Sequence, residues 1–444
     1  MLPALLLLSP KPTDAFDDYL KKPDPAYAWK AGEESQGSRE IALTSQTWQG
    51  VEWKHSILYR QPPGFVGKGT ALLYITGDGP RPGDLIDLAL ITAAAKVPVA
   101  MLFDVPNQPL WDMKEDDLIA HTFNKYLETG DATWPLLFPM AKSAIRAMDA
   151  IQAYTKDSDN PIRQFVVTGA SKRGWTTWFV GAANDKRVIG IAPMVYDNLN
   201  LAAQMPHQLK SWGKYSEQIE DYTRRGLQAK LATKEGKRLG EMVDPFTYRD
   251  RIKMPTLVVN GANDPYWAAD ALSLYWNKLK QPRALLTVPN AGHTLGNRLQ
   301  TIETVGAFAR AATTNAFFPT IDATIVREEE RLKASVSPHT RPIQFELPIT
   351  GASQQKSLAL WVAESDTTDF REAKWTAVDR QMNAAANVAA DPGRGLPERV
   401  ILTTSVSYLY APLTKGRRTA AFIEARYVGP DGKEFSVCSP TKVF

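Results

Sequence analysis

The sequence predicts an α/β fold with a mostly parallel sheet flanked by helices, followed by a β-rich region. Apolar runs typical of buried strands alternate with segments of helical period between residues 71 and 313. One of these runs, residues 165–168, ends in a Gly-x-Ser turn that leads into a helical segment. After about residue 320 the alternation stops, and β-favouring runs are separated by turns such as 429–432.

The length and composition indicate a globular chain with more than one domain. The chain has 444 residues, of which 44% are hydrophobic and 23% are charged. We expect an N-terminal arm over residues 1–35 and an α/β domain over 36–320, with a helical lid inserted at about 199–250. A β-sandwich-like domain is expected over 321–444.

Charge and cysteine content exclude several classes of protein. The net charge of +4 is small and dispersed, so nucleic acid is not an expected partner. The single cysteine, Cys438, excludes an intrachain disulfide and a cysteine-based metal site. His, Cys and Asp residues do not cluster at ligand spacing, so we expect neither a metal nor another cofactor. Nothing in the sequence specifies an oligomeric state.

The N-terminus carries a short apolar run at residues 2–8. It resembles the core of a secretory signal, which predicts a secreted or periplasmic protein. A basic segment before it and a clear cleavage site after it are missing, so a cytoplasmic protein with an apolar tail is the alternative. No segment of the sequence is apolar for long enough to cross a bilayer.

The periodicity sets the expected order of elements. Residues 9–35 are expected to form an extended arm anchored by Tyr19, Tyr27 and Trp29. A hairpin is expected at 41–48 and 51–59, and further strands at 71–76, 97–103, 165–168, 188–195, 254–260 and 284–288. Helices are expected at 85–95, 115–126, 136–154, 267–279 and 295–313. The β-rich end has candidate strands at 326–336, 343–347, 357–364, 400–410 and 420–428.

The central motif is the strand, turn and helix around Ser171. The turn reads Gly169-Ala170-Ser171-Lys172-Arg173-Gly174-Trp175, which predicts a nucleophile elbow. The two glycines fit this reading because side chains at those positions would block the close approach of strand and helix. The second glycine stands one residue later than in the commoner Gly-x-Ser-x-Gly pattern. The alternative is an ordinary turn in which Ser171 caps the helix.

Two further groups complete a hydrolytic constellation. Asp264 and His293 each follow a later strand, and the order Ser, Asp, His is that of the α/β-hydrolases. A serine hydroxyl needs a base to take its proton, histidine can return that proton to the leaving group, and a carboxylate orients the imidazole. Asp197 also ends a strand and is the rival for the acid.

Acyl transfer also needs donors for the oxyanion. The backbone N–H of Lys172 is the first candidate, because it follows the nucleophile. The second is expected from Asp78 or Gly79, in the loop after the strand at 71–76, and the alternative there is a plain tight turn.

Several residues are candidates for substrate binding. Lys172 and Arg173 either hold a substrate carboxylate or pair with the acidic residues at 115–117. Trp175, Asp197 and His207 are further candidates. In a peptidase that holds a substrate ammonium, Glu217 and Glu220 of the lid would be the acidic residues.

With these residues identified, the sequence resembles the PhoPQ-activated pathogenicity-related protein family, secreted proteins of the α/β-hydrolase fold. The matching segments are 115–120, 134–135, 139–149, 169–175 and 260–264. The resemblance implies that Ser171, Asp264 and His293 form the triad and that the protein is exported. The elbow is also similar to that of glucuronoyl esterases, which favours an ester substrate, whereas peptidase relatives of the fold favour an amide.

The sequence therefore predicts a secreted serine hydrolase that acts on an ester or peptide bond through an acyl-enzyme. Its expected substrate is a small molecule, a glycan ester or a peptide. The alternative is a non-catalytic secreted binding or signalling protein built on a hydrolase scaffold.

Overall fold

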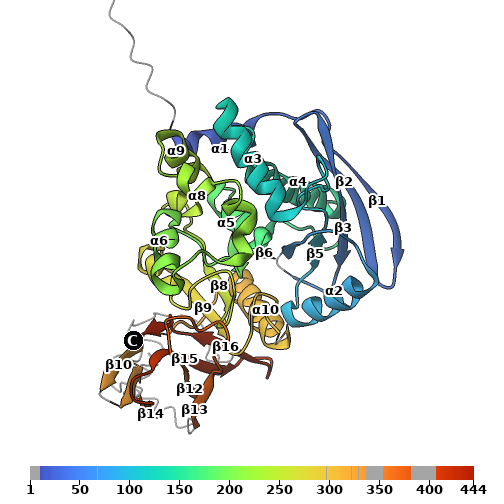
Figure 1. Ribbon diagram of the computed structural model, residues 1–444. Coiled ribbons are helices and arrows are strands. Elements are labelled where there is room, and N and C mark those ends of the chain that lie inside the picture. The colour runs from blue at the N-terminus through green and yellow to red at the C-terminus, as the bar shows by residue number, and fades with distance from the viewer. Residues whose placement is uncertain are drawn as a thin grey trace, which may run out of the picture.

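The computed structural model describes residues 11–67, 69–296, 298–321, 323–328, 330–336, 354–381 and 407–444. A large twisted sheet with helices on its faces makes up most of the molecule, and antiparallel strands from the C-terminal end lie beside β9 and α10 (Figure 1). The apolar run at residues 2–8 and the strand expected at 343–347 lie outside the described residues, as does the first part of the strand expected at 400–410.

The central sheet has nine strands in the order β1-β2-β3-β5-β4-β6-β7-β8-β9. The first three strands are antiparallel, β3 pairs antiparallel with β5, and the pairs from β5 to β9 are parallel. The strands are β1 Ala28–Ser35, β2 Ser38–Trp48, β3 Val51–Arg60, β4 Thr70–Ile75, β5 Val99–Leu102, β6 Gln164–Ala170, β7 Val188–Met194, β8 Thr256–Gly261 and β9 Arg283–Val288. The predicted α/β fold with a mostly parallel sheet flanked by helices is confirmed.

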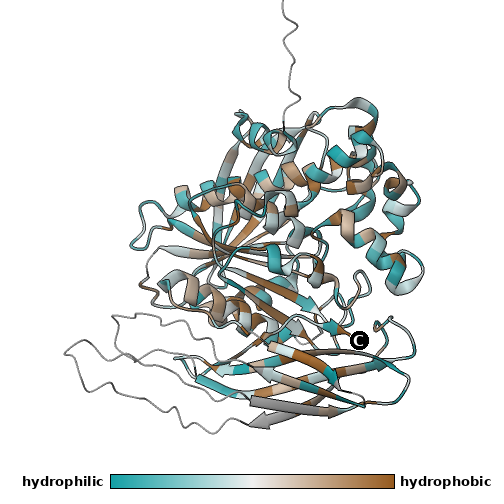
Figure 2. Ribbon diagram, turned by 90° about the vertical axis from the view of Figure 1, so that its left-hand side faces the viewer, coloured by the Kyte–Doolittle hydropathy of each residue, from teal (hydrophilic) through white to brown (hydrophobic). Residues whose placement is uncertain are grey.

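Helices cover the parallel strands and bury them on both faces. The flanking helices are α2 Pro82–Ala95, α3 Glu115–Thr129, α4 Leu137–Thr155, α5 Lys172–Ala182 and α10 Arg298–Thr314. Helix α2 packs against α10, and α4 packs against α5. The parallel strands are accordingly almost continuously apolar, which Figure 2 shows as brown ribbons within the sheet.

The N-terminal segment differs from the expected extended arm. Residues Pro12–Lys21 form helix α1, and the next segment adds β1 to the edge of the sheet. Phe16 of α1 is fully buried, and its ring centroid lies 5.1 Å from that of Phe138 and 5.0 Å from that of Phe179. Burial of this aromatic face explains why the segment is helical.

The helix expected at 267–279 is also wrong. The segment forms two short 3₁₀ turns, η3 Ala271–Leu274 and η4 Trp276–Lys278. Asn200 Nδ2 donates to the Leu274 carbonyl at 3.0 Å, and the Tyr275 hydroxyl donates to Asp197 at 2.6 Å. These two hydrogen bonds to distant residues hold the segment in 3₁₀ turns in place of a regular α-helix.

A helical insertion follows β7 and precedes β8. Its elements are α6 Leu201–Trp212, η1 Glu217–Ile219, α7 Glu220–Thr223, α8 Leu227–Lys230, α9 Lys234–Val243 and η2 Pro245–Tyr248. Arg224 and Arg225 of this insertion form ion pairs with Asp117 at the start of α3. We call residues 199–250 the lid. Within the described ranges, no helix is both long enough and apolar enough to span a bilayer.

The C-terminal module, the described residues from 323 onward, contains two antiparallel sheets. One has the order β10-β11-β14, with β10 Ala323–Glu328 and β11 Arg331–Val336 forming a hairpin where a single strand was expected, and β14 Ser407–Pro412. The other has β13 Thr376–Gln381, β12 Gln354–Ser365, β15 Arg418–Val428 and β16 Glu434–Cys438, with β17 Lys442–Val443 paired to β15. The backbone N–H of Ser436 donates to Thr304 of α10 at 3.2 Å, and Lys433 pairs with Glu303 at 2.9 Å, so this module is fastened to the α/β domain.

Candidate active site

The turn between β6 and α5 has the geometry of a nucleophile elbow. Ser171 lies in the left-handed region, with φ 58° and ψ −123°, which is strained for a residue with a side chain. A Cβ added to Gly169 would lie 2.7 Å from the Arg173 carbonyl oxygen, and one added to Gly174 would lie 2.4 Å from that of Met194. Both glycines are therefore required by close backbone contacts. The Ser171 side chain makes no helix-capping hydrogen bond, so the alternative of a capping serine is wrong.

The structure brings Ser171, Asp264 and His293 together just after the carboxyl ends of β6, β8 and β9, respectively. Ser171 Oγ lies 2.8 Å from His293 Nε2, and His293 Nδ1 lies 2.9 Å from Asp264 Oδ2. The Asp264 side chain is 7% exposed, and its other oxygen accepts the backbone N–H of Tyr266 at 2.9 Å. A proton held on Nδ1 by the carboxylate leaves the Nε2 lone pair free to accept the serine proton.

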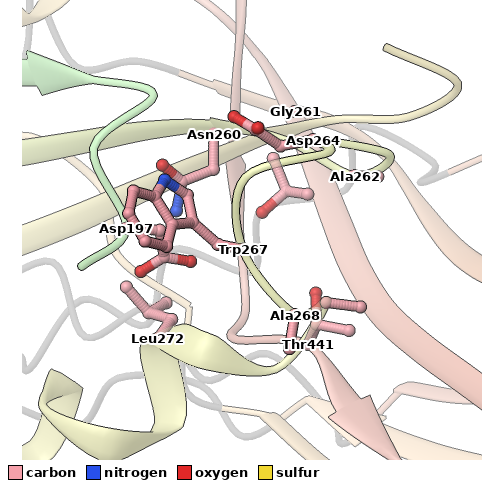
Figure 3. A pocket seen from close by; sticks show the side chains of 11 residues that line it. Asp197, Asn260, Gly261, Ala262, Asp264, Trp267, Ala268, Leu272 and Thr441 are labelled. Atoms are coloured by element: carbon pink, nitrogen blue, oxygen red, sulfur yellow. The ribbon is translucent and has the colours of Figure 1, made fainter. Parts of the chain in front are cut away.

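Asp197, the rival acid, has a different partner. Its carboxylate accepts the Tyr275 hydroxyl, and burial raises its pKa to about 7. It lines a small pocket together with Asn260, Asp264 and Trp267, as Figure 3 shows. The imidazole of His293 is bonded to Asp264, so the structure does not bring Asp197 to the base or into the pocket beside Ser171.

The candidate oxyanion donors differ in whether their N–H groups already have a partner. The N–H of Lys172 is the first of α5, where backbone donors have no partner within the helix and the helix dipole favours a negative charge. The N–H of Gly79 points at the Asp104 carboxylate at 3.4 Å. The Asp78 carboxylate accepts from Gln108 at 2.7 Å and from Lys114 at 3.3 Å. The loop after β4 is therefore held mainly by contacts with the segment at 104–114.

The two cations beside Ser171 are paired with α3, as the ion-pair alternative predicts. Arg173 Nη1 and Nη2 each lie 2.8 Å from Glu115, and Lys172 Nζ lies 2.7 Å from Asp116. Burial acts to raise the pKa of Glu115, but the bonds and charges of Arg173 and Lys172 outweigh it and lower that pKa to about 2. The Arg173 side chain is 10% exposed, and its Nε donates to the Val105 carbonyl, so all three of its guanidinium nitrogens have protein partners.

A largely apolar pocket opens beside Ser171 and His293. Trp175 lines it, donates its indole N–H to the Val243 carbonyl at 2.7 Å and stacks on Tyr196 with ring centroids 4.8 Å apart. The lid supplies much of the remaining wall, with Leu201, Met205, Ile219, Tyr222, Leu227 and Leu239. His207 is not part of the wall, and its Nε2 lies 2.7 Å from Asp270. Glu217 pairs instead with Lys214 and, at 3.0 Å, with Arg371.

Several residues at the site were missed by sequence reasoning. The Tyr266 ring stacks on the His293 imidazole, with centroids 4.1 Å apart, and its place two residues after Asp264 was an available signal. Asn263 and Asn290 fasten the Asp264 and His293 loops to the C-terminal module. No local pattern in the sequence identifies their partners, which lie 85 to 110 residues away. In the part of the chain that the structure describes, no group of three or more His, Cys, Asp or Glu side chains is arranged to hold a metal.

The chain is similar in sequence to proteins of one known family. The family model described as PhoPQ-activated pathogenicity-related protein matches residues 16–371. The autocrine proliferation repressor protein A of Dictyostelium discoideum is 32% identical over 380 residues, which cover 80% of this chain and 75% of that protein.

Solved structures to which the chain is similar include an acetyl xylan esterase and an S-formylglutathione hydrolase. Acetyl xylan esterase 1 from Thermoanaerobacterium sp. JW/SL YS485 is 17% identical, with a TM-score of 0.46, over 63% of this chain and 87% of that one. The S-formylglutathione hydrolase from Agrobacterium tumefaciens is 10% identical, with a TM-score of 0.42, over 64% of this chain and 98% of that one.

Proposed function

This chain belongs to the PhoPQ-activated pathogenicity-related protein family, and we propose that it is a serine hydrolase that cleaves a carboxylic ester through a covalent acyl-enzyme. One observation carries the proposal. Ser171, at a strained elbow, is hydrogen-bonded to His293, whose other nitrogen is bonded to the buried carboxylate of Asp264. This arrangement supplies a nucleophile, a base and an orienting acid within contact of one pocket.

The proposed reaction follows from these positions. Ser171 Oγ attacks the substrate carbonyl carbon while His293 Nε2 takes the hydroxyl proton, and Asp264 stabilises the imidazolium. The Lys172 N–H stabilises the oxyanion, with a second donor proposed from the backbone of Asp78, or of Gly79 if its N–H leaves the Asp104 carboxylate. His293 then gives its proton to the departing alcohol as the C–O bond breaks. Water, activated by the same imidazole, hydrolyses the acyl-enzyme and regenerates Ser171.

An ester is favoured over a peptide with a free amino terminus. Such a peptidase needs a free carboxylate in the pocket to hold the substrate ammonium. Of the two candidates for that role, Glu217 is paired with Lys214 and Arg371, and Glu220 is exposed and does not line the pocket. Asp116, which does line it, is paired with Lys172. These pairs support an uncharged substrate at the site.

A fluorophosphonate probe tests the proposal, because it reacts covalently with an activated serine. The native protein is expected to be labelled, Ser171→Ala to lose the label, and Ser273→Ala, at an exposed serine, to keep it. If the native protein is folded, as judged by circular dichroism, but is not labelled, the proposed hydrolase activity is contradicted. That result would favour a signalling role, which the word autocrine in the name of the Dictyostelium relative suggests.

We also propose that the protein is exported, on the basis of the apolar run at residues 2–8. Amino-terminal sequencing of the protein recovered outside the cytoplasm is expected to begin beyond this run. Retention of the intact N-terminus in the cytoplasmic fraction would contradict export.

A further inference from the structure

The pocket beside Ser171 is lined mainly by apolar and aromatic side chains. Its wall combines lid side chains such as Leu201, Met205 and Leu239 with aromatic rings from the α/β domain, including Phe123 and Trp175. The ring centroid of Phe123 lies 6.0 Å from that of Trp175 and 6.2 Å from that of Tyr222. This wall removes apolar surface from water and offers few polar partners.

The charges that face the pocket are already neutralised by protein partners. Lys172 Nζ lies 2.7 Å from Asp116 and 3.2 Å from Glu115. Asp116 also accepts the Tyr222 hydroxyl at 2.9 Å. His293 is engaged with Ser171 and Asp264. Among the described residues of the wall, the charged side chains are thus committed to one another, and a charged substrate group would enter without a partner.

We propose that the substrate is a neutral ester bearing an apolar group larger than acetyl, and that the lid forms the binding wall for that group. The inference rests on the proposed function and specifies its substrate. Lengthening the apolar group is expected to raise kcat/KM by about fourfold per methylene until the pocket is filled, the factor expected for burial of one methylene.

The test compares p-nitrophenyl acetate, butyrate, hexanoate and octanoate with p-nitrophenyl esters that carry a terminal carboxylate or ammonium. A matching series of alkyl acetates shows whether the acyl or the alcohol side occupies the pocket. We expect kcat/KM to rise along one of the two neutral series and to be at least about tenfold lower for charged esters of equal length. Rates that stay equal along both neutral series, or a preference for a charged ester, would overturn the proposal.

Two variants on one helix locate the effect. Met205→Trp fills the pocket from α6 and is expected to lower the ratio of kcat/KM for octanoate to that for acetate by about tenfold or more. Leu209→Trp, at a position 42% exposed on the same helix, is expected to leave both rates unchanged. Equal effects of the two variants would overturn the pocket assignment. Fluorophosphonate labelling of Ser171 separates this failure from failure of the hydrolase itself.

A second inference concerns one segment of the C-terminal module, residues 368–375 between β12 and β13. Asn263 Nδ2 lies 2.7 Å from the Ala373 carbonyl oxygen, with the Phe370 and Arg371 carbonyls at 3.0 and 3.1 Å. Asn290 donates to the Trp375 carbonyl at 3.0 Å and accepts the Trp375 N–H at 2.8 Å. Asn263 precedes Asp264, and Asn290 lies three residues before His293.

The same segment contacts the lid. The Thr368 hydroxyl donates to the Ser211 carbonyl at 2.6 Å, and the Arg371 guanidinium lies 4.3 Å from the centroid of the Trp212 ring. Arg371 also pairs with Glu217 at 3.0 Å. One loop of the C-terminal module thus joins the acid loop, the base loop and the lid.

We infer that residues 368–375 are a positioning element, and that Asn263 and Asn290 are positioning residues that hold Asp264 and His293 against Ser171. Asn290→Asp keeps the acceptor for Trp375 and removes the donor, while Asn290→Ala removes both. Because a misplacement of about 1 Å can cost about 10² in rate, we expect kcat to fall by 10- to 100-fold in the Ala variant. We expect a smaller fall in the Asp variant, with KM little changed in either.

The control is Lys433→Met, which breaks a contact between the C-terminal module and α10 away from the site. It is expected to leave kcat and the pH profile of kcat/KM unchanged, whereas Asn290→Ala shifts that profile by loosening the His293–Asp264 bond. If both variants changed kcat equally, or if Asn290→Ala lowered the melting temperature with kcat unchanged, the segment would be structural only.

Discussion

The two sides of the site are held in place by different parts of the molecule. The nucleophile side, Ser171 with Lys172 and Arg173, is fixed by the backbone of the β6–α5 turn and by ion pairs to α3, all within the α/β domain. The acid–base side, Asp264 and His293, lies on two loops fastened to the C-terminal module through Asn263 and Asn290. A local turn therefore positions the nucleophile, and long-range contacts position its partners.

This difference has an energetic consequence. The strained backbone conformation of Ser171 is held by close backbone contacts at Gly169 and Gly174 on either side of it. The acid and base loops are bonded to each other, since the Asn263 N–H donates to the Ala291 carbonyl at 2.9 Å. They also depend on the bonds that the Asn263 and Asn290 side chains make with the C-terminal module, which form only when the whole chain has folded. Disturbing the first side is expected to lower stability first, and disturbing the second to lower turnover first.

The largest expected effect separates the two acids on the acid–base side. Asp264→Asn presents an amide to His293 Nδ1 and is expected to lower kcat by about 10⁴, because the imidazole then takes the wrong tautomer. Asp197→Asn is the matched control and is expected to keep kcat within about threefold of the native value, since Asp197 bonds Tyr275 instead. Steady-state kinetics of the two variants checks this, and the reverse ranking would make Asp197 the acid.

Asp197 also predicts how stability depends on pH. Burial raises the pKa of Asp197 to about 7 from 3.8. The stability that the protonated carboxyl contributes to the folded state is therefore present in full below pH 3.8 and is lost as pH rises through 7. Relative to the native protein, Asp197→Asn is expected to gain stability over this range, by up to about 4 kcal/mol at pH 8. Denaturant unfolding at pH 4 and pH 8 measures the difference, and a difference independent of pH would contradict the account.

On the nucleophile side, Gly174→Ala tests the backbone constraint. The added Cβ would lie 2.4 Å from the Met194 carbonyl oxygen, so the turn must shift, at an expected cost of about 3 kcal/mol in unfolding free energy. Gly83→Ala, where an added Cβ meets nothing within 4 Å, is the control and is expected to be neutral or slightly stabilising. A Gly174→Ala protein as stable as the native one would show that the elbow is not tightly packed.

The ion pairs to α3 are expected to give the smallest effect. Glu115→Gln weakens the bond to Arg173 and is expected to cost about 1–2 kcal/mol, a value reduced by the 38% exposure of the Glu115 side chain. Because the pKa of Glu115 is lowered to about 2, this contribution is present above pH 4.5 and fades as pH falls toward 2. Thermal unfolding at pH 7 and pH 3 measures it.

Glu128→Gln, at the exposed end of the same helix, is the control for that experiment and is expected to leave the melting temperature unchanged. Equal effects of the Glu115 and Glu128 variants would show that Glu115 does not support the elbow.

The features that could be predicted from the sequence are determined locally or by the order of the strands, and the features that could not be predicted depend on distant contacts. The elbow is a local signal, because Gly169, Ser171 and Gly174 must be close in sequence to make the turn. The order of Ser171, Asp264 and His293 was also readable, since the carboxyl ends of parallel strands meet at one edge of a sheet. The alternating apolar runs predicted the sheet because strands buried on both faces have few polar residues.

The missed features depend on distant partners. Nothing near Asn290 in the sequence shows that it binds Trp375, and nothing near residues 12–21 shows that Phe16 is buried against Phe138. The 3₁₀ turns after Asp264 replace a helix because Asn200 and Asp197, far back in the chain, bind that segment. Local periodicity carries no information about such contacts.

The central claim is that Ser171 becomes covalently acylated. We would mix the protein with p-nitrophenyl butyrate, quench with acid within milliseconds, and measure the mass of the intact chain and of its peptides. The account predicts the added mass of one butyryl group on the peptide that contains Ser171, and no adduct in Ser171→Ala. Release of p-nitrophenol with no adduct on that peptide, or with an adduct on another residue, would contradict it.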